Sequence, residues 1–107
     1  MADEGHLRAE QLLTLSSAAR RLSDLVAASD APLRYEVLRH LLRVSEETMT
    51  EVLDEAVHAG LVRRGDDAFT YVPASNLIGR DIRDALGPRI ERLQSQIAVA
   101  REHVLGS

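Results

Sequence analysis

Apolar residues recur at steps of three and four along most of the chain, which is the spacing of the buried face of a helix. The helices that this spacing predicts cover residues 6–13, 17–29, 34–43, 46–59, 76–86 and 88–104. Serines stand at the start of three of them, where a hydroxyl can accept a free backbone N–H of the first turn: the Ser16-Ser17 pair, Ser45 and Ser75. Pro32 and the Gly87-Pro88 pair stand at two of the breaks. The pattern therefore predicts a mainly helical chain.

The helical spacing gives way to a short β-hairpin after residue 60. Gly60 is suited to the left-handed position that ends a helix. Residues 61–64 and 68–72 follow as two short strands around a Gly65-Asp66-Asp67 turn. A helix, a glycine and a hairpin in this order resemble the last helix and the wing of a winged helix-turn-helix. We therefore expect a mainly α fold with a small β-hairpin wing, that is, a winged helix-turn-helix with extra N- and C-terminal helices.

The length and composition are those of one small domain, 1–107, whose first five residues we expect to be disordered. The chain has 107 residues, of which 45% are apolar and 3% aromatic, so its core must consist of Leu, Val, Ile and Ala. It has no cysteine, which excludes disulfides and cysteine zinc sites. No apolar run is long enough to span a membrane, and no signal peptide opens the chain. We expect a cytoplasmic location without membrane contact.

The helix predicted over 46–59 carries acidic residues on the side opposite its apolar stripe, which contains Met49, Val52, Leu53, Ala56 and Val57. In DNA-binding helix-turn-helix proteins this second helix lies in the major groove. Here it has no arginine, so its carboxylates would face DNA phosphates. Each close pair of like charges would cost about 1 kcal/mol even at the dielectric of water. Its composition disfavours DNA and favours a protein-interaction face, whose candidate residues are Glu47, Glu51, Asp54, Glu55 and His58.

The 13 cationic residues are all arginine, yet the formal net charge is −4, which does not favour a general binder of polyanions. Six arginines are candidate contacts for a nucleic acid or a protein partner: Arg20, Arg21, Arg63, Arg64, Arg80 and Arg83. Arg63 and Arg64, at the root of the wing, are close in sequence to Asp66 and Asp67 at its tip. We favour the simpler interpretation that such arginines are solvated or pair with nearby carboxylates.

Residues that could catalyse a reaction or hold a metal show no recognisable spacing. The histidines are spread one to an element without an HExxH motif: His6, His40, His58 and His103. The serines have no GxSxG context, and the chain contains no glycine-rich phosphate-binding motif. We therefore predict no catalytic residue, no cofactor, no metal site and no enzymatic activity.

Four segments of the chain carry a family resemblance: LTLSSAARRLSDLVA, EVLRHLLRVSEETMTEVLDEAVHAGLVRR, FTY and LIGRDIRDALGP. In this order and separation, from about Leu7 to Glu102, they resemble the winged-helix domain that follows the nucleotide-binding module in large ATP-dependent bacterial regulators. These are regulators of the STAND/AAA type, including LuxR-type and AfsR-type proteins. Where that family has a histidine near the nucleotide this chain has Ser75 and Asn76, and the family's tyrosine falls at Arg83. The resemblance therefore carries over no nucleotide contact.

Together, the pattern and the resemblance imply a noncatalytic module of a bacterial signalling or transcription regulator, acting through a neighbouring domain or a protein partner. The alternative is a free-standing winged-helix DNA-binding regulator. It would dimerise through an apolar stripe on its last helix, formed by Ile90, Leu93, Ile97, Ala100 and Val104. An adaptor whose partner is another chain is a third interpretation.

Overall fold

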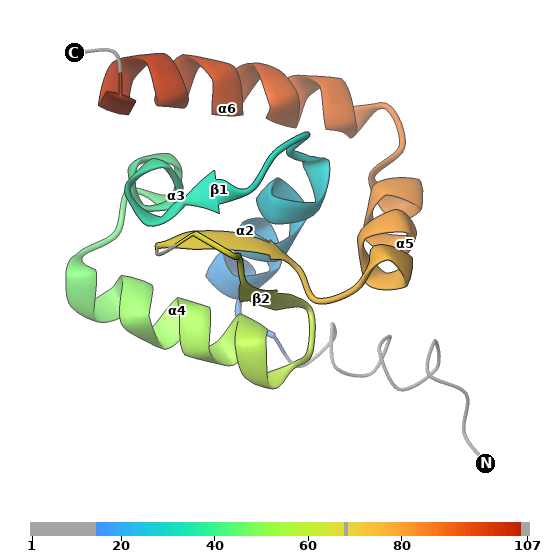
Figure 1. The fold of residues 1–107 in the computed structure, drawn as a ribbon, viewed down its shortest axis with the longest axis horizontal. Coiled ribbons are helices and arrows are strands. Elements are labelled where there is room, and N and C mark those ends of the chain that lie inside the picture. The colour runs from blue at the N-terminus through green and yellow to red at the C-terminus, as the bar shows by residue number, and fades with distance from the viewer. Residues whose placement is uncertain (1–14, 68, 106–107) are drawn as a thin grey trace.

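The structure is a computed structural model that describes residues 15–67 and 69–105. The helix predicted over 6–13 and the disorder predicted for residues 1–5 lie outside the described residues. In the described part, five helices pack around a small three-stranded sheet (Figure 1). In chain order the elements are α2 Ser17–Ala28, β1 Leu33–Arg34, α3 Tyr35–Leu42, α4 Glu46–His58, β2 Val62–Arg64, β3 Thr70–Pro73, α5 Asn76–Leu86 and α6 Arg89–Leu105.

The centre of the fold is α2, which contacts α3, α4, α5, α6 and β3. Figure 1 shows α6 along one edge of the molecule and α4 along the opposite edge, with α2 between them. Because partners surround it, α2 buries more than the single apolar stripe that its sequence predicts. Its buried residues are Ala19, Leu22, Ser23, Leu25, Val26, Ala27 and Ala28. The hydroxyl of Ser23 donates to the Ala19 carbonyl at 3.0 Å, so this buried polar side chain is satisfied.

The local signals for helix ends are confirmed. The side chains of Ser16, Ser45 and Ser75 accept hydrogen bonds from backbone N–H groups in the first turns of α2, α4 and α5. Gly60 has φ +76°, the left-handed conformation expected after α4. Arg43 has φ +56° and ends α3, so that α4 begins only three residues later. The turn between α3 and α4 is therefore tight.

The sheet has the strand order β1-β3-β2, and both pairings are antiparallel. The predicted hairpin is present as β2 and β3, with Val62 opposite Pro73. The prediction had no counterpart to β1, in which buried Leu33 pairs with Tyr71. With only two residues, β1 is too short to show a period, and it exists because β3 supplies its pairing partner. The predicted start of the next helix, at residue 34, is correspondingly one residue early.

The tip of the hairpin differs from the predicted strand over 68–72. Phe69 precedes β3, has φ +66° and is 66% exposed, whereas the strand itself begins at Thr70. Its carbonyl accepts a hydrogen bond of 2.7 Å from the Tyr35 N–H. Gly65 approaches the same loop closely, because a Cβ atom there would lie 2.5 Å from Thr70 Oγ1. Phe69 therefore belongs to the loop between the two strands and not to β3.

The main core cluster lies where α2, α3, α4 and the sheet meet, and most of it is Leu, Val, Ile and Ala as predicted. Met49 and Tyr71 are also buried in it. A smaller cluster joins the end of α2 to α5 and includes Ile82 and Leu86. Because residues of α2 belong to both clusters, α2 is the element against which the other helices are positioned.

Leu25→Ala should lower the free energy of unfolding by about 2–5 kcal/mol, because a fully buried Leu leaves a cavity that its neighbours fill only in part. The matched control is Leu77→Ala on α5. Since Leu77 is 53% exposed, its removal should change stability by less than about 0.5 kcal/mol. Urea unfolding followed by circular dichroism measures both, and equal losses would contradict the central place of α2.

Candidate functional site

The solvent side of α4 carries an acidic face, which we define as Glu47, Glu51 and Asp54. All three side chains are exposed, because burial of Met49, Val52, Leu53 and Ala56 turns this side outward. The ion pairs among the described residues join Arg34 to Glu36, Arg39 to Glu46 and Arg83 to Asp30, so none involves the acidic face. The carboxylates of the acidic face are therefore accessible and not neutralised within the described chain.

His58 and Val57 lie at the C-terminal end of the same side. His58 is exposed, and its Nδ1 atom lies 2.9 Å from the Asp54 carbonyl oxygen of the preceding turn. Val57 was predicted in the buried stripe but is 43% exposed. The stripe ends at Ala56 because the chain leaves the helix at Ala59 and turns into β2, so Val57 has no element to pack beneath. An apolar side chain thus stands next to the acidic face.

Glu55 has a different position from the other predicted interaction residues of α4. It is half-buried, and its carboxylate accepts two hydrogen bonds from Ser16, one from the backbone N–H and one of 2.9 Å from the hydroxyl. Ser16 is the N-cap of α2, so this contact ties the start of α2 to α4. A sequence signal was present, since Glu55 follows Val52 by three residues and borders the apolar stripe.

Arg83 also makes internal contacts. Its Nε atom donates to the Ala27 carbonyl at 2.6 Å, and its Nη2 atom donates to the Ser29 carbonyl at 3.3 Å. Both carbonyls lie at the C-terminal end of α2. The same guanidinium lies 3.6 Å from an Asp30 carboxylate oxygen. The structure therefore places Arg83 in a scaffold role, although sequence reasoning grouped it with exposed Arg63, Arg64 and Arg80.

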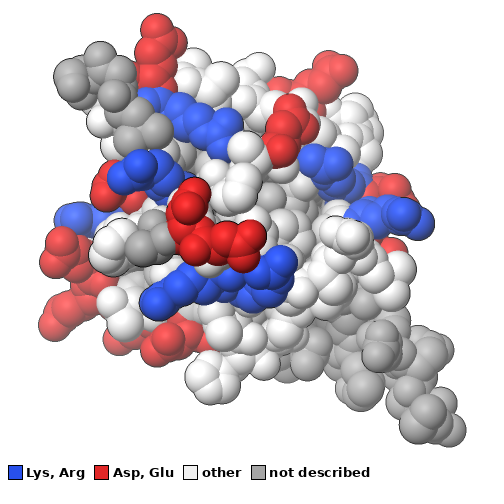
Figure 2. All heavy atoms as spheres, viewed as in Figure 1, with Lys and Arg blue, Asp and Glu red and all other residues white. Residues whose placement is uncertain are grey.

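The two arginine pairs proposed for DNA contact do not line a common depression. Arg20 and Arg21 line an open depression between α2 and α6, whereas Arg63 lines one formed by the loop after α2 and the end of β3. Figure 2 shows arginines and carboxylates interspersed over the hairpin side of the molecule, without a large area of one sign. Arg63 and Arg64 are exposed there, and neither takes part in an ion pair within the described residues.

The apolar stripe of α6 faces inward. Ile97 and Ala100 are each 2% exposed, and Leu93 and Val104 pack against the same core. Ile90 packs against the smaller cluster at the end of α2. The stripe predicted as a dimer surface is therefore occupied by the chain's own α2 and α3, which both contact α6.

Burial raises the pKa of the Asp24 carboxyl above its ordinary value of 3.8, and the nearby Arg20 and Arg89 guanidinium groups oppose this rise without cancelling it. The folded chain thus holds the Asp24 proton to a higher pH than the unfolded chain does. This group's contribution to the free energy of unfolding must therefore fall as the pH rises from about 3.8 through the folded-state pKa.

Two histidines that are far apart in sequence come together. The rings of His40 on α3 and His103 on α6 have centroids 4.8 Å apart. Sequence reasoning missed this contact because it depends on how α6 lies across α3. No group of three or more His, Cys, Asp or Glu side chains in the described residues is placed to hold a metal ion.

Comparison with known protein families finds none that matches this chain, and comparisons with characterised proteins and with solved structures find no match either. Among the residues that the structure describes, no helix is both long enough and apolar enough to cross a membrane.

Glu55→Ala should destabilise the chain by about 1 kcal/mol, because it removes the acceptor that holds Ser16 at the start of α2. Glu51→Ala, on the acidic face of the same helix, should change stability by less than about 0.5 kcal/mol. Urea unfolding measures the loss of stability in both variants. It thereby compares Glu55, whose carboxylate has an internal partner, with Glu51, whose carboxylate has no ion pair in the described chain. Equal losses would mean that the Ser16 contact does not stabilise the fold.

Asp24→Asn should raise the melting temperature at neutral pH, because the amide removes the penalty of a half-buried charge. Below the ordinary carboxyl pKa of 3.8 the variant and the parent should melt together, since Asp24 is then protonated in both states. Thermal unfolding at the two pH values tests this sign. A lower melting temperature at neutral pH would mean that attraction to Arg20 and Arg89 outweighs burial.

Proposed function

We propose that this chain is a noncatalytic winged-helix module of a bacterial signalling or transcription regulator, which binds a neighbouring domain or a protein partner through α4. The observation that carries the proposal is the acidic face, whose three carboxylates are exposed and have no ion pair among the described residues. Charged groups that lack internal partners are free to complement a cationic surface.

The order of the elements supports the winged-helix part of the proposal. A helix, a short strand, two helices joined by a tight turn and an antiparallel hairpin follow one another from α2 to β3. In a winged helix the second helix of the pair is the one that enters a DNA groove, and here that helix is α4. α5 and α6 are then additions that cover the far end and side of α2.

The charge on α4 supports a protein rather than DNA as its partner. Phosphate contacts from Lys or Arg supply most of the nonspecific affinity of a protein for a duplex. The exposed side of α4 has carboxylates where those contacts are needed, and its only cationic candidate is His58. A protein surface rich in Arg or Lys would gain from the same carboxylates.

A free-standing DNA-binding regulator is less consistent with the geometry. It needs Arg20 and Arg21 to act with Arg63 and Arg64, but the pairs belong to different depressions of the surface or lie outside them. It also needs an exposed dimer stripe, and Ile97 and Ala100 of that stripe are buried. We therefore keep the protein-binding module as the proposal.

DNA binding by charge-reversed variants tests the proposal directly. The wild-type chain should not bind a labelled duplex in fluorescence anisotropy between about 50 and 200 mM salt, the range in which phosphate contacts weaken steeply. The triple variant Glu47→Arg, Glu51→Arg, Asp54→Arg should gain salt-sensitive binding, because it removes the repulsion from a helix positioned to meet DNA.

The matched control reverses three exposed carboxylates elsewhere, Asp84, Glu91 and Glu102, and changes the net charge by the same amount. This control should not bind, because net charge alone does not orient a helix in a groove. Salt-sensitive binding by the wild type that is lost on Arg63→Ala with Arg64→Ala would instead establish the DNA-binding regulator.

The protein-binding claim has its own readout. A photo-crosslinking amino acid in place of exposed Thr50, beside the acidic face, should form a covalent product with a protein in the source cell. The same amino acid in place of exposed Ala98 on α6 should give no such product. Equal crosslinking from both positions would show that α4 is not the preferred surface.

A further inference from the structure

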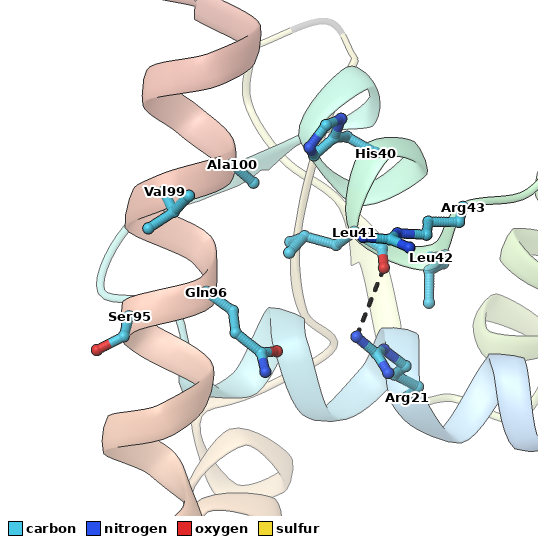
Figure 3. A pocket seen from close by; sticks show the side chains of 9 residues that line it. All are labelled: Arg21, His40, Leu41, Leu42, Arg43, Ser95, Gln96, Val99 and Ala100. Atoms are coloured by element: carbon cyan, nitrogen blue, oxygen red, sulfur yellow. Dashed lines mark hydrogen bonds between the residues drawn. The ribbon is translucent and has the colours of Figure 1, made fainter.

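A groove lies between α3 and α6, and Arg21 of α2 also lines it. It has a volume of about 590 Å³, and its wall residues include Arg21, His40, Leu41, Leu42, Arg43 and Val99. In Figure 3 Val99 and Gln96 of α6 lie on one side, His40 and Leu41 of α3 lie opposite, and Arg21 reaches in from α2. Val99 is 66% exposed, and Leu41 and Leu42 add further apolar surface to the lining of the groove. The groove is therefore lined by both arginines and apolar side chains.

The groove continues along α6 into a second depression, of about 380 Å³, that shares Arg21 and Gln96 with it. The second depression adds three arginines, Arg20, Arg89 and Arg92. Asp24 is the one carboxylate among the described residues that line the two depressions. We call this joined surface the arginine groove.

Asp24, which attracts Arg20 and Arg89, compensates part of the charge of the arginine groove, whereas Arg21, Arg43 and Arg92 have no ion pair within the described chain. None of the ion pairs there involves its arginines. The guanidinium of Arg21 makes only a hydrogen bond of 3.5 Å to the Leu41 carbonyl. The apolar part of the lining argues against a nucleic acid backbone as the occupant, because phosphates gain nothing from Leu41, Leu42 and Val99. An acidic helix that also displays an apolar side chain would use both parts of the groove.

Such a helix is present in the chain itself. α4 displays the acidic face with Val57 beside it, and Val57 is 43% exposed. The acidic face lies on the solvent side of α4, and none of its carboxylates forms an ion pair with an arginine of the groove within its own described chain. The complementary surfaces can therefore meet between copies.

We propose that α4 of one copy docks in the arginine groove of a second copy, so that the chain associates head to tail. The inference rests on the proposed function of the acidic face as a protein-binding surface, and it identifies a second copy as a partner. Carboxylates of α4 would face the arginines of the groove, and Val57 would lie against the apolar residues that line it. Because the two surfaces differ, a pair of copies joined by one such contact keeps one unused surface of each kind. Such a contact does not close on itself after two copies.

The test uses two variants that each lose one surface. Arg21→Glu with Arg92→Glu reverses the arginine groove, and Glu51→Arg with Asp54→Arg reverses the acidic face. All four residues are exposed and helical, and circular dichroism checks that the variants fold. Sedimentation velocity is measured at about 0.01 M salt, where charges act over about 30 Å, and at about 1 M, where they act over about 3 Å.

At low salt the mass of the wild type should rise with concentration above the 11.8 kDa of one chain, and at high salt it should return to that value. Each variant alone should remain monomeric at both salt concentrations. An equimolar mixture of the two should associate again, because the intact acidic face of one variant can meet the intact arginine groove of the other, and the two reversed surfaces are again opposite in charge. The control Arg63→Glu with Arg80→Glu, outside the groove, should associate as the wild type does.

A wild-type chain that stays monomeric at low salt overturns the inference, as does a mixture of the two variants that forms no complex. Loss of association in the Arg63→Glu, Arg80→Glu control also overturns it, because the contact would then depend on net charge. The proposed function is tested separately by the crosslink from position 50. A monomeric wild type with a crosslink to a different protein would therefore contradict head-to-tail association and support the protein-binding module.

Discussion

A helix surrounded by other elements must find partners for the backbone groups at its two ends, because these have none within the helix. α2 meets this constraint with side chains from later parts of the chain. Glu55 of α4 holds its N-cap, Ser16, and Arg83 of α5 donates to the carbonyls of Ala27 and Ser29 at the other end. Two residues of α6 complete that end, since Gln94 donates to Ala28 at 3.0 Å and Arg101 to Ser29 Oγ at 3.2 Å. Three helices are thereby oriented around one.

This arrangement separates charged residues that hold the fold from those that remain available. Glu55 and Arg83 have internal partners, whereas Glu51 and Asp54 are exposed without any ion pair in the described part of the chain. α6 lies across α2 and α3 with its apolar stripe inward, and its flank forms one wall of the arginine groove. Two separate surfaces of opposite charge thus arise from the same packing.

The helices and their ends could be predicted because their signals are local. Apolar spacing, the capping serines and Gly60 each act within a few residues, and the structure has helices at those positions. The contacts that sort the charged residues are not local. Glu55 meets Ser16 across 39 residues, and Arg83 meets Ala27 across 56. β1 and the left-handed Phe69 likewise depend on the neighbouring strand and loop, so the pattern of the sequence could not reveal them.

The contact between Glu55 and Ser16 also fixes how far α4 can roll about its own axis. In many helices the acidic residue that bonds the N-cap N–H lies three positions after the cap, but that position in α2 is Ala19. Here the acid comes from α4, so turning α4 would release the first turn of α2 as well. The side of α4 that carries Glu51 and Asp54 is therefore held in one orientation relative to α2. A surface ordered in advance loses less conformational entropy on binding, and it favours partners whose charges match that orientation.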